Sequence, residues 1–115
     1  MTRTYLCKLN ESKRFSPPGH VKTESWPLIG PNEGSRNITV HVSEMKPGGA
    51  ALKHTHETSE QIYIVLGGKA EMVVGGQTFR VTKGDAVYIP ANVEHEAKVI
   101  GKEKFKSIVI IAPPL

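Results

Sequence analysis

Residues 48–68 read GGAALKHTHETSEQIYIVLGG, a stretch with two histidines near its middle and a pair of glycines at each end. His54 and His56 are separated by one residue. On a β-strand, such side chains point to the same face, about 6.6 Å apart along the chain, whereas on a helix they diverge. If this segment is a strand, both imidazoles lie on one face, an arrangement typical of one edge of a metal site.

The chain around this stretch has the rhythm of an all-β protein. Glycine and proline recur every 8 to 12 residues, and the segments between them are rich in Val, Ile, Thr, Tyr and Phe. No window has the apolar spacing of a helix over three turns. We expect eight strands, enough to close a small barrel. They span residues 35–45, 51–56, 61–66, 69–74, 77–81, 86–89, 95–100 and 105–112.

Glycine-rich turns divide these strands. Gly75-Gly76 between two alternating runs predicts a two-residue hairpin, because such turns need positive φ. Tight reversals are also expected at 83–85 and 47–49. The 115 residues fit one domain. We expect residues 35–115 to form the barrel and residues 1–34 to form an irregular arm that packs on the barrel or on a second subunit.

Composition excludes several classes of protein. The net charge of +4 is mild, and Lys102, Lys104 and Lys106 fit the solvated face of a strand better than a nucleic-acid site. The single cysteine, Cys7, cannot form an intramolecular disulfide. No apolar leader follows the N-terminus, and no run approaches the 18 apolar residues of a membrane span. We therefore expect a cytoplasmic protein that binds neither nucleic acid nor membrane.

A third histidine completes a metal-binding pattern. His95 stands about forty residues after His56, where another strand begins. A sheet that curls into a barrel would bring it to the His54–His56 pair, together with a side-chain oxygen from the strand at 61–66. Such a nitrogen-rich set suits one divalent Mn, Fe, Co, Ni, Cu or Zn ion and does not suit Mg or Ca.

Two residues compete for the fourth ligand position. Glu60 and Gln61 stand together at the start of a strand, and alternation sends only one of them inward. An inward Glu60 would also turn the more apolar set of alternate residues inward, and its carboxylate is the stronger ligand. An inward Gln61 would turn Tyr63 and Val65 inward. The remaining histidines, His20 and His41, are expected to be structural or exposed.

With these residues, the sequence resembles the cupin family in two motifs. The first, G-x5-H-x-H-x(3,4)-E-x6-G, is matched by Gly48, His54, His56, Glu60 and Gly67, or with Gln61 and Gly68 in the longer spacing. The second, G-x5-P-x-G-x2-H-x3-N, is matched by Gly84, Pro90 and His95, with Asn92 in place of its glycine and Val99 in place of its asparagine. Both departures leave every metal ligand in place.

The resemblance implies a double-stranded β-helix, or jelly-roll, barrel that is usually a homodimer and holds a metal in its mouth. It aligns Gln61 with the usual third ligand, and we favour Gln61 over Glu60 on that ground. It implies no single reaction, because function does not follow from fold.

We therefore expect a metalloenzyme that acts on a small oxygenated metabolite, such as an anionic sugar acid or a keto or hydroxy acid. The metal would provide Lewis-acid or O2 chemistry, as in an isomerase, a lyase or a dioxygenase. Tyr63, or Glu60 if it faces inward, is the candidate catalytic group. The alternative is a non-catalytic module that binds or senses a small ligand or a metal.

Overall fold

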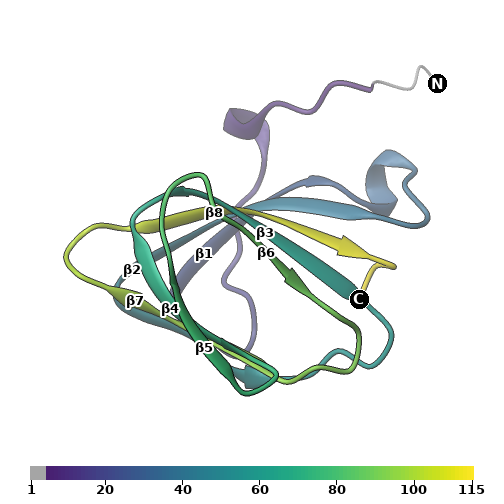
Figure 1. Ribbon diagram of the computed structural model, residues 1–115. Helices are drawn as coiled ribbons and strands as arrows, with labels where there is room; N and C mark the ends of the chain where they lie inside the picture. The colour runs from purple at the N-terminus through teal and green to yellow at the C-terminus, as the bar shows by residue number, and fades with distance from the viewer. Residues whose placement is uncertain (1–4) are drawn as a thin grey trace.

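The protein is nearly all β-strand (Figure 1). The structure is a computed structural model that describes residues 5–115. Its strands are β1 (His20–Ile29), β2 (Thr39–His54), β3 (Glu60–Gly67), β4 (Lys69–Val74), β5 (Gln77–Val81), β6 (Ala86–Ile89), β7 (His95–Ile100) and β8 (Phe105–Ala112). Two 3-10 turns, η1 (Leu9–Glu11) and η2 (Pro31–Glu33), precede β2. The predicted all-β class is confirmed.

One long strand joins the two sides of the barrel. The strand order is β5-β4-β7-β2-β8-β3-β6, with β1 paired to β2, and every pairing is antiparallel. The first half of β2 pairs with β8 from Thr39 to Met45, and its second half pairs with β7 from Ala50 to His54. The sheet therefore curls on itself as a jelly roll, as Figure 1 shows.

Alternate residues of each strand fill the barrel. Along β8, buried and half-buried positions alternate strictly from Phe105 to Ala112. Phe105, Met45, Met72 and Ile89 are each at most 2% exposed. Burial of each such side chain stabilises the fold by about 1.5–3 kcal/mol. This two-residue period determines which side chains can reach the interior.

Two of the three turns predicted from the sequence are present in the structure. Gly75 and Gly76 have φ of 54° and 82° and connect β4 to β5 with Val74 opposite Gln77, as the hairpin prediction required. The amide of Asp85 donates to the carbonyl of Thr82, which closes the predicted reversal at 83–85.

The predicted reversal at 47–49 is wrong. Residues 39–54 form one strand, and the strands expected at 35–45 and 51–56 are its two halves. The Pro47-Gly48-Gly49 segment lies where β2 changes partner from β8 to β7. Gly49 is required there because a Cβ would lie 2.7 Å from the carbonyl oxygen of Lys46 and 2.9 Å from that of Val21. The chain changes partner strands at this point without turning back.

The N-terminal segment is more regular than expected. Residues 20–29 form β1, which pairs along β2 from His20 opposite Ala51 to Ile29 opposite Val40. Before β1, Phe15 and Ser25 exchange two backbone hydrogen bonds of 2.8 Å. The prediction of an irregular arm is therefore wrong for residues 20–29. Pro27 and the charged residues Lys22 and Glu24 hide the strand pattern in this segment.

Among the described residues, no helix is long and apolar enough to cross a membrane.

Candidate metal centre

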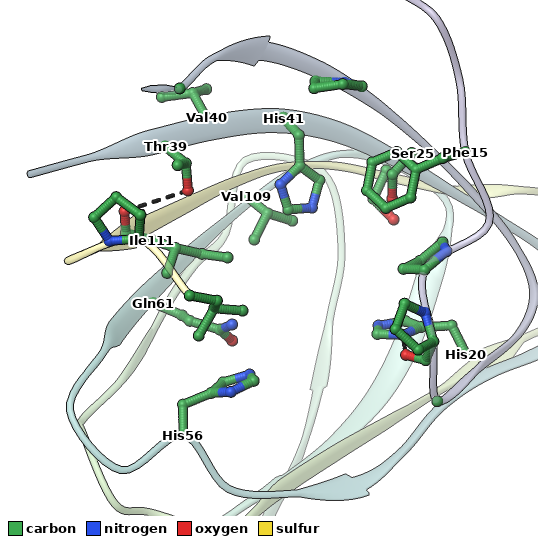
Figure 2. Close-up of a pocket in the computed structure, with 18 of the residues that line it drawn as sticks. Phe15, His20, Ser25, Thr39, Val40, His41, His56, Gln61, Val109 and Ile111 are labelled. Carbon is green, nitrogen blue, oxygen red and sulfur yellow. Dashed lines mark hydrogen bonds between the residues drawn. The ribbon is translucent and has the colours of Figure 1, made fainter. Parts of the chain in front are cut away.

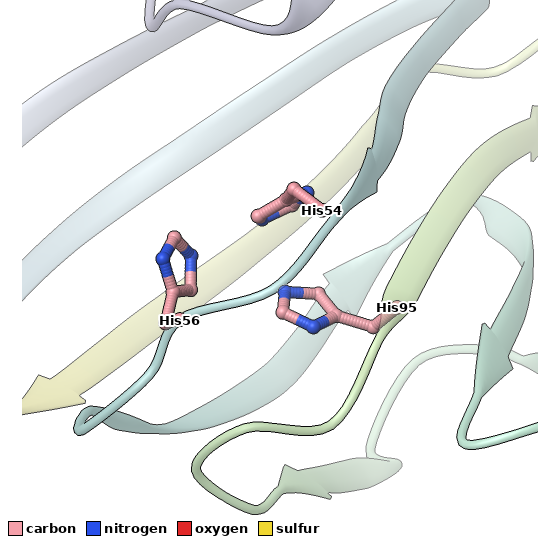
Figure 3. Close-up of side chains that lie close together, drawn as sticks. All are labelled: His54, His56 and His95. Carbon is pink, nitrogen blue, oxygen red and sulfur yellow. The ribbon is translucent and has the colours of Figure 1, made fainter.

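Three histidines meet at one end of the barrel (Figure 3). His54 is the last residue of β2, His95 is the first residue of β7, and the two are cross-strand partners. His56 lies just beyond β2, although the sequence placed it within a strand. We call these three residues the histidine cluster. One ligand nitrogen from each lies within 4.8 Å of the others, which is compatible with one metal ion.

Ring contacts within the cluster are close. The centroids of His54 and His95 are 4.1 Å apart, those of His54 and His56 are 4.7 Å apart, and those of His56 and His95 are 5.4 Å apart. Three imidazolium rings at these separations would repel one another. The cluster is therefore built for neutral rings or for a cation between them.

Backbone carbonyls set the tautomers of two of these rings. Nδ1 of His54 lies 2.6 Å from the carbonyl oxygen of Leu52, and Nδ1 of His95 lies 2.9 Å from that of Val93. A carbonyl oxygen only accepts hydrogen bonds, so each Nδ1 carries the proton and donates it. Each Nε2 is left with a free lone pair, the form in which a metal is bound.

Two buried polar atoms in this region have no hydrogen-bond partner: Oε1 of Gln61 and Nε2 of His95. Gln61 is 4% exposed and His95 is 3% exposed. Leaving a buried acceptor unsatisfied costs about 1–3 kcal/mol. A cation between Oε1 and the imidazole nitrogens would satisfy both atoms, so the residues present fit a metal.

The strand parity at Glu60 and Gln61 is decided by burial. Gln61, Tyr63 and Val65 are 4%, 6% and 1% exposed, whereas Ile62 and Leu66 lie on the outer face at 38% and 39%. Glu60 is exposed and accepts a hydrogen bond from the hydroxyl of Tyr88. The alternative with Glu60 inward, and with it the candidate role of Glu60 as a catalytic group, is therefore wrong.

Burial also sets the protonation of the cluster. Desolvation lowers the pKa of His56, and the charges of His54, His95 and His20 lower it further. Desolvation likewise lowers the pKa of His95, although its hydrogen bond to the Val93 carbonyl acts in the opposite direction. Both rings are therefore neutral at pH 7, and metal binding does not have to displace a proton from them.

Asn92 connects the loops that carry His56 and His95. Its amide donates a 2.7 Å hydrogen bond to the carbonyl of His56, and its φ is 63°. This left-handed conformation favours glycine and is tolerated by asparagine. The asparagine that replaces the motif's glycine therefore preserves the backbone geometry there.

A cavity of about 670 Å³ adjoins the cluster and extends to the wall formed by β1 and the start of β2. Its lining includes His54 and His20, whose rings lie near each other, and Figure 2 shows Gln61 and His56 facing His41 across the space. Neither His20 nor His41 belongs to the histidine cluster, as the sequence suggested, and both line the cavity. A lone histidine on a strand gives no sequence signal of this kind. Only the pairing of β1 with β2 and β8 with β2 brings them to the cavity.

His20 extends the row of imidazoles. Its ring centroid lies 6.1 Å from that of His54, and its Nδ1 lies 2.8 Å from the carbonyl oxygen of Pro18. By the same argument as above, Nδ1 donates and Nε2 keeps its lone pair. Desolvation lowers the pKa of His20, so this lone pair is available at pH 7 as a hydrogen-bond acceptor.

Tyr63, the other candidate catalytic residue, lies in the interior and lines the cavity. Burial raises its pKa to about 12. The hydroxyl is therefore protonated throughout the physiological range and can donate a hydrogen bond to a bound molecule. At this pKa it is a weak acid, which suits a positioning role better than full proton transfer.

Residues 41–111 match the Cupin domain family, and the chain belongs to that family. Both motifs and the whole histidine cluster lie within the matched segment. The strand order described above is the cupin jelly roll.

Three similar proteins illustrate the range of this family. The chain is 39% identical over 67 residues to the uncharacterized protein MJ1618 of Methanocaldococcus jannaschii, covering 58% of this chain and 54% of that protein. It is 25% identical over 96 residues to the polyketide synthase CurC of Streptomyces cyaneus, covering 83% of this chain and 60% of that protein. The chain thus spans little more than half the length of these two relatives.

The third is a solved structure, the polyketide cyclase RemF of Streptomyces resistomycificus. It superposes with a TM-score of 0.78 at 26% sequence identity, and the match covers 98% of this chain and 79% of that chain. The fold of nearly the whole chain, including β1, therefore recurs in a protein described as an enzyme.

Proposed function

We propose that this protein is a metal-dependent enzyme that binds an oxygenated metabolite at a centre formed by His54, His56, His95 and Gln61. The observation that carries the proposal is the pair of buried acceptors, Gln61 Oε1 and His95 Nε2, which have no partner among the described residues. Unsatisfied buried acceptors are rare in folded proteins, and a ligand shared with the two further imidazoles would offset their cost.

A divalent transition metal held by these four residues would supply Lewis-acid polarisation of a substrate oxygen or, if redox-active, chemistry with O2. The chain's own residues contribute the remainder. The Tyr63 hydroxyl donates a hydrogen bond to a substrate oxygen, and the free Nε2 of His20 accepts one from a substrate hydroxyl. The wall of the cavity formed by residues 15–31 excludes water from the bound molecule.

Support for an enzyme also comes from the relatives. CurC and RemF are described as a polyketide synthase and a polyketide cyclase. Both names denote chemistry on carbonyl-rich carbon chains. We accordingly favour a reaction in which a carbonyl compound is enolised, isomerised or cyclised, with O2 chemistry as the second possibility for the same centre.

A non-catalytic binding module is the second candidate, and one observation favours it. Among the described residues that line the cavity, Glu33 has the one carboxylate side chain, and it accepts a 2.8 Å hydrogen bond from the amide of Gly30. Acid–base work in the cavity would depend on histidines and Tyr63 alone.

Elemental analysis of the purified protein tests the metal centre. We expect about one equivalent of a transition metal in the wild type, loss of the metal in His56→Ala and His95→Ala, and retention in His41→Ala, a matched histidine variant outside the cluster. Full metal content in both cluster variants would overturn the proposal.

Measuring turnover distinguishes the metal-dependent enzyme from the non-catalytic binding module. Metal-loaded and EDTA-treated protein would be incubated in D2O with keto acids, unsaturated uronates and 1,3-diketones, aerobically and anaerobically, and followed by NMR. We expect metal-dependent loss of a C–H signal or product formation with at least one carbonyl compound. Absence of both throughout the panel would favour the binding module.

A further inference from the structure

The cavity is unusually poor in charge for a site expected to take an organic acid. Its lining is dominated by apolar side chains, among them Phe15, Leu52, Val109 and Ile111. A volume of about 670 Å³ lies in the middle of the range, about 300–1,000 Å³, that encloses drug-sized molecules. The space is therefore suited to a sizeable apolar body.

Apart from histidines, Glu33 and Lys53 are the acidic and basic side chains among the described residues that line the cavity. Glu33 is engaged by the Gly30 amide. The Lys53 side chain is 57% exposed, and its Nζ lies 3.9 Å from a carboxylate oxygen of Glu94. Within residues 5–115, no arginine lines the cavity. A carboxylate on the ligand, away from the metal, would lose its hydration without gaining a counter-charge.

His41 supplies a polar group on the wall opposite the metal centre. Figure 2 shows its ring projecting into the cavity, with Gln61 and His56 on the facing side. On β2 it is flanked by Val109 of β8 and Pro27 of β1, neither of which has a polar side chain. Within residues 5–115 its ring forms no hydrogen bond.

The protonation of His41 fits an uncharged partner. Burial lowers its pKa to about 4, and the charge of His20 acts in the same direction. At pH 7 the ring is neutral, with one N–H to donate and one lone pair to accept. It can therefore pair with a hydroxyl or carbonyl group but offers no charge to a carboxylate.

We propose that the cavity binds an uncharged, mainly apolar molecule with oxygens at two separated positions, one at the metal centre and the other hydrogen-bonded to His41. This inference rests on the proposed function for the first oxygen. It replaces the small anionic sugar or keto acid that the sequence suggested with a larger, neutral phenol- or ketone-like substrate class.

A cycle of two ligands and two proteins tests the role of His41. 2-Naphthol and 2,6-dihydroxynaphthalene differ by one hydroxyl group, and both are uncharged at pH 7. Their affinities for zinc-loaded wild type and His41→Phe would be measured by calorimetry. We expect the second hydroxyl to improve affinity about five- to tenfold in the wild type, as one net hydrogen bond does, and less than twofold in His41→Phe.

The single-hydroxyl ligand controls for folding, because 2-naphthol should bind the wild type and His41→Phe within about twofold. His41→Gln, which keeps donor and acceptor groups, should retain part of the gain. An equal gain from the second hydroxyl in wild type and His41→Phe, with 2-naphthol still bound, would overturn the assignment of His41.

D-Galacturonate tests the charge of the ligand. We expect it to bind the zinc-loaded protein at least tenfold more weakly than 2,6-dihydroxynaphthalene. Equal or tighter binding of galacturonate, or no binding of either naphthalene, would overturn the ligand class.

Repeating the cycle on EDTA-treated protein separates this inference from the metal-dependent function. A His41-dependent gain in a protein that never retains metal would refute the function and leave the His41 site standing. If the protein retains metal but the second hydroxyl gives no His41-dependent gain, the His41 site would be refuted and the metal-dependent function would stand.

Discussion

The two sides of the cavity are built in different ways. On the metal side, His54 and His95 are cross-strand partners at the ends of β2 and β7, and both lie in the segment that matches the Cupin domain. On the opposite side, His41 comes from the first half of β2, beside Pro27 of β1, and belongs to no motif. The first side is specified by short-range register, and the second by how the N-terminal segment packs. A change in the opposite wall therefore need not alter the histidine cluster.

The largest expected effect is a loss of zinc affinity caused by a substitution on the metal side of the cavity. His95→Ala removes one of two buried acceptors and should weaken zinc binding by about 100-fold or more, since even outer-shell changes cost 10–100-fold. His41→Ala should change it less than threefold. Competition titration against a chromophoric chelator measures both. Similar losses in the two variants would mean that the two sides are not independent.

The next effect is the pH dependence of stability that His41, on the opposite wall, should cause. The pKa of His41 is about 4 in the fold and near 6.5 in the unfolded chain, so the unfolded state binds the proton first as pH falls. Stability should be lost as the pH drops from about 6.5 toward 4, by up to about 2 kcal/mol between pH 7.5 and 5.

Urea unfolding of metal-free wild type and His41→Gln at both pH values isolates this contribution. His20, His56 and His95 also have lowered pKa values. Their contribution to the pH dependence of the unfolding free energy is present in both the wild type and the variant. Equal pH dependence in the two proteins would show that His41 is hydrated rather than buried.

A smaller effect tests the backbone that supports the metal side. Asn92→Val places a β-branched residue at φ 63° and should cost about 1–2 kcal/mol of stability. Because the Asn92 amide holds the loop of His56, zinc affinity should also fall. Asn92→Gly should match the wild type in both. Thermal unfolding and zinc titration provide the measurements. If Asn92→Val changes neither stability nor zinc affinity, Asn92 does not support the loop of His56.

The smallest effect is expected at Glu60. Its side chain lies outside the barrel against Tyr88, so Glu60→Ala should leave zinc affinity unchanged and alter stability by less than about 0.5 kcal/mol. Gln61→Ala, one position along, should weaken zinc binding about tenfold. The reverse ranking in the same titration would restore Glu60 as the ligand.

Much of this fold could be predicted from local signals. The strands at 69–74, 77–81, 86–89, 95–100 and 105–112 have the bounds expected from glycine turns and alternation. Counting apolar residues on β3 gave the wrong face, because this interior has to hold Gln61 and Tyr63, while Ile62 and Leu66 remain partly exposed outside. Apolar content identifies the buried face only where the interior carries no polar site.

The ligand wall could not be predicted for a different reason. β1 contains Pro27 and charged residues, and only its pairing with β2 makes it a strand. His20 and His41 reach the cavity through contacts between strands far apart in sequence, which no single-chain pattern encodes. The histidine cluster was predictable because the spacing of its members is itself a property of one or two strands.

The continuity of β2 has a consequence for ligand length. His41 and His54 lie on the same strand, on opposite sides of the Pro47-Gly48-Gly49 segment where it changes partners. The distance between the two polar ends of the cavity is therefore set by the length of one strand. Inserting two residues at Gly48 would lengthen the strand between the two histidines and leave both side chains unchanged. Ligands with more widely spaced oxygens would then bind better.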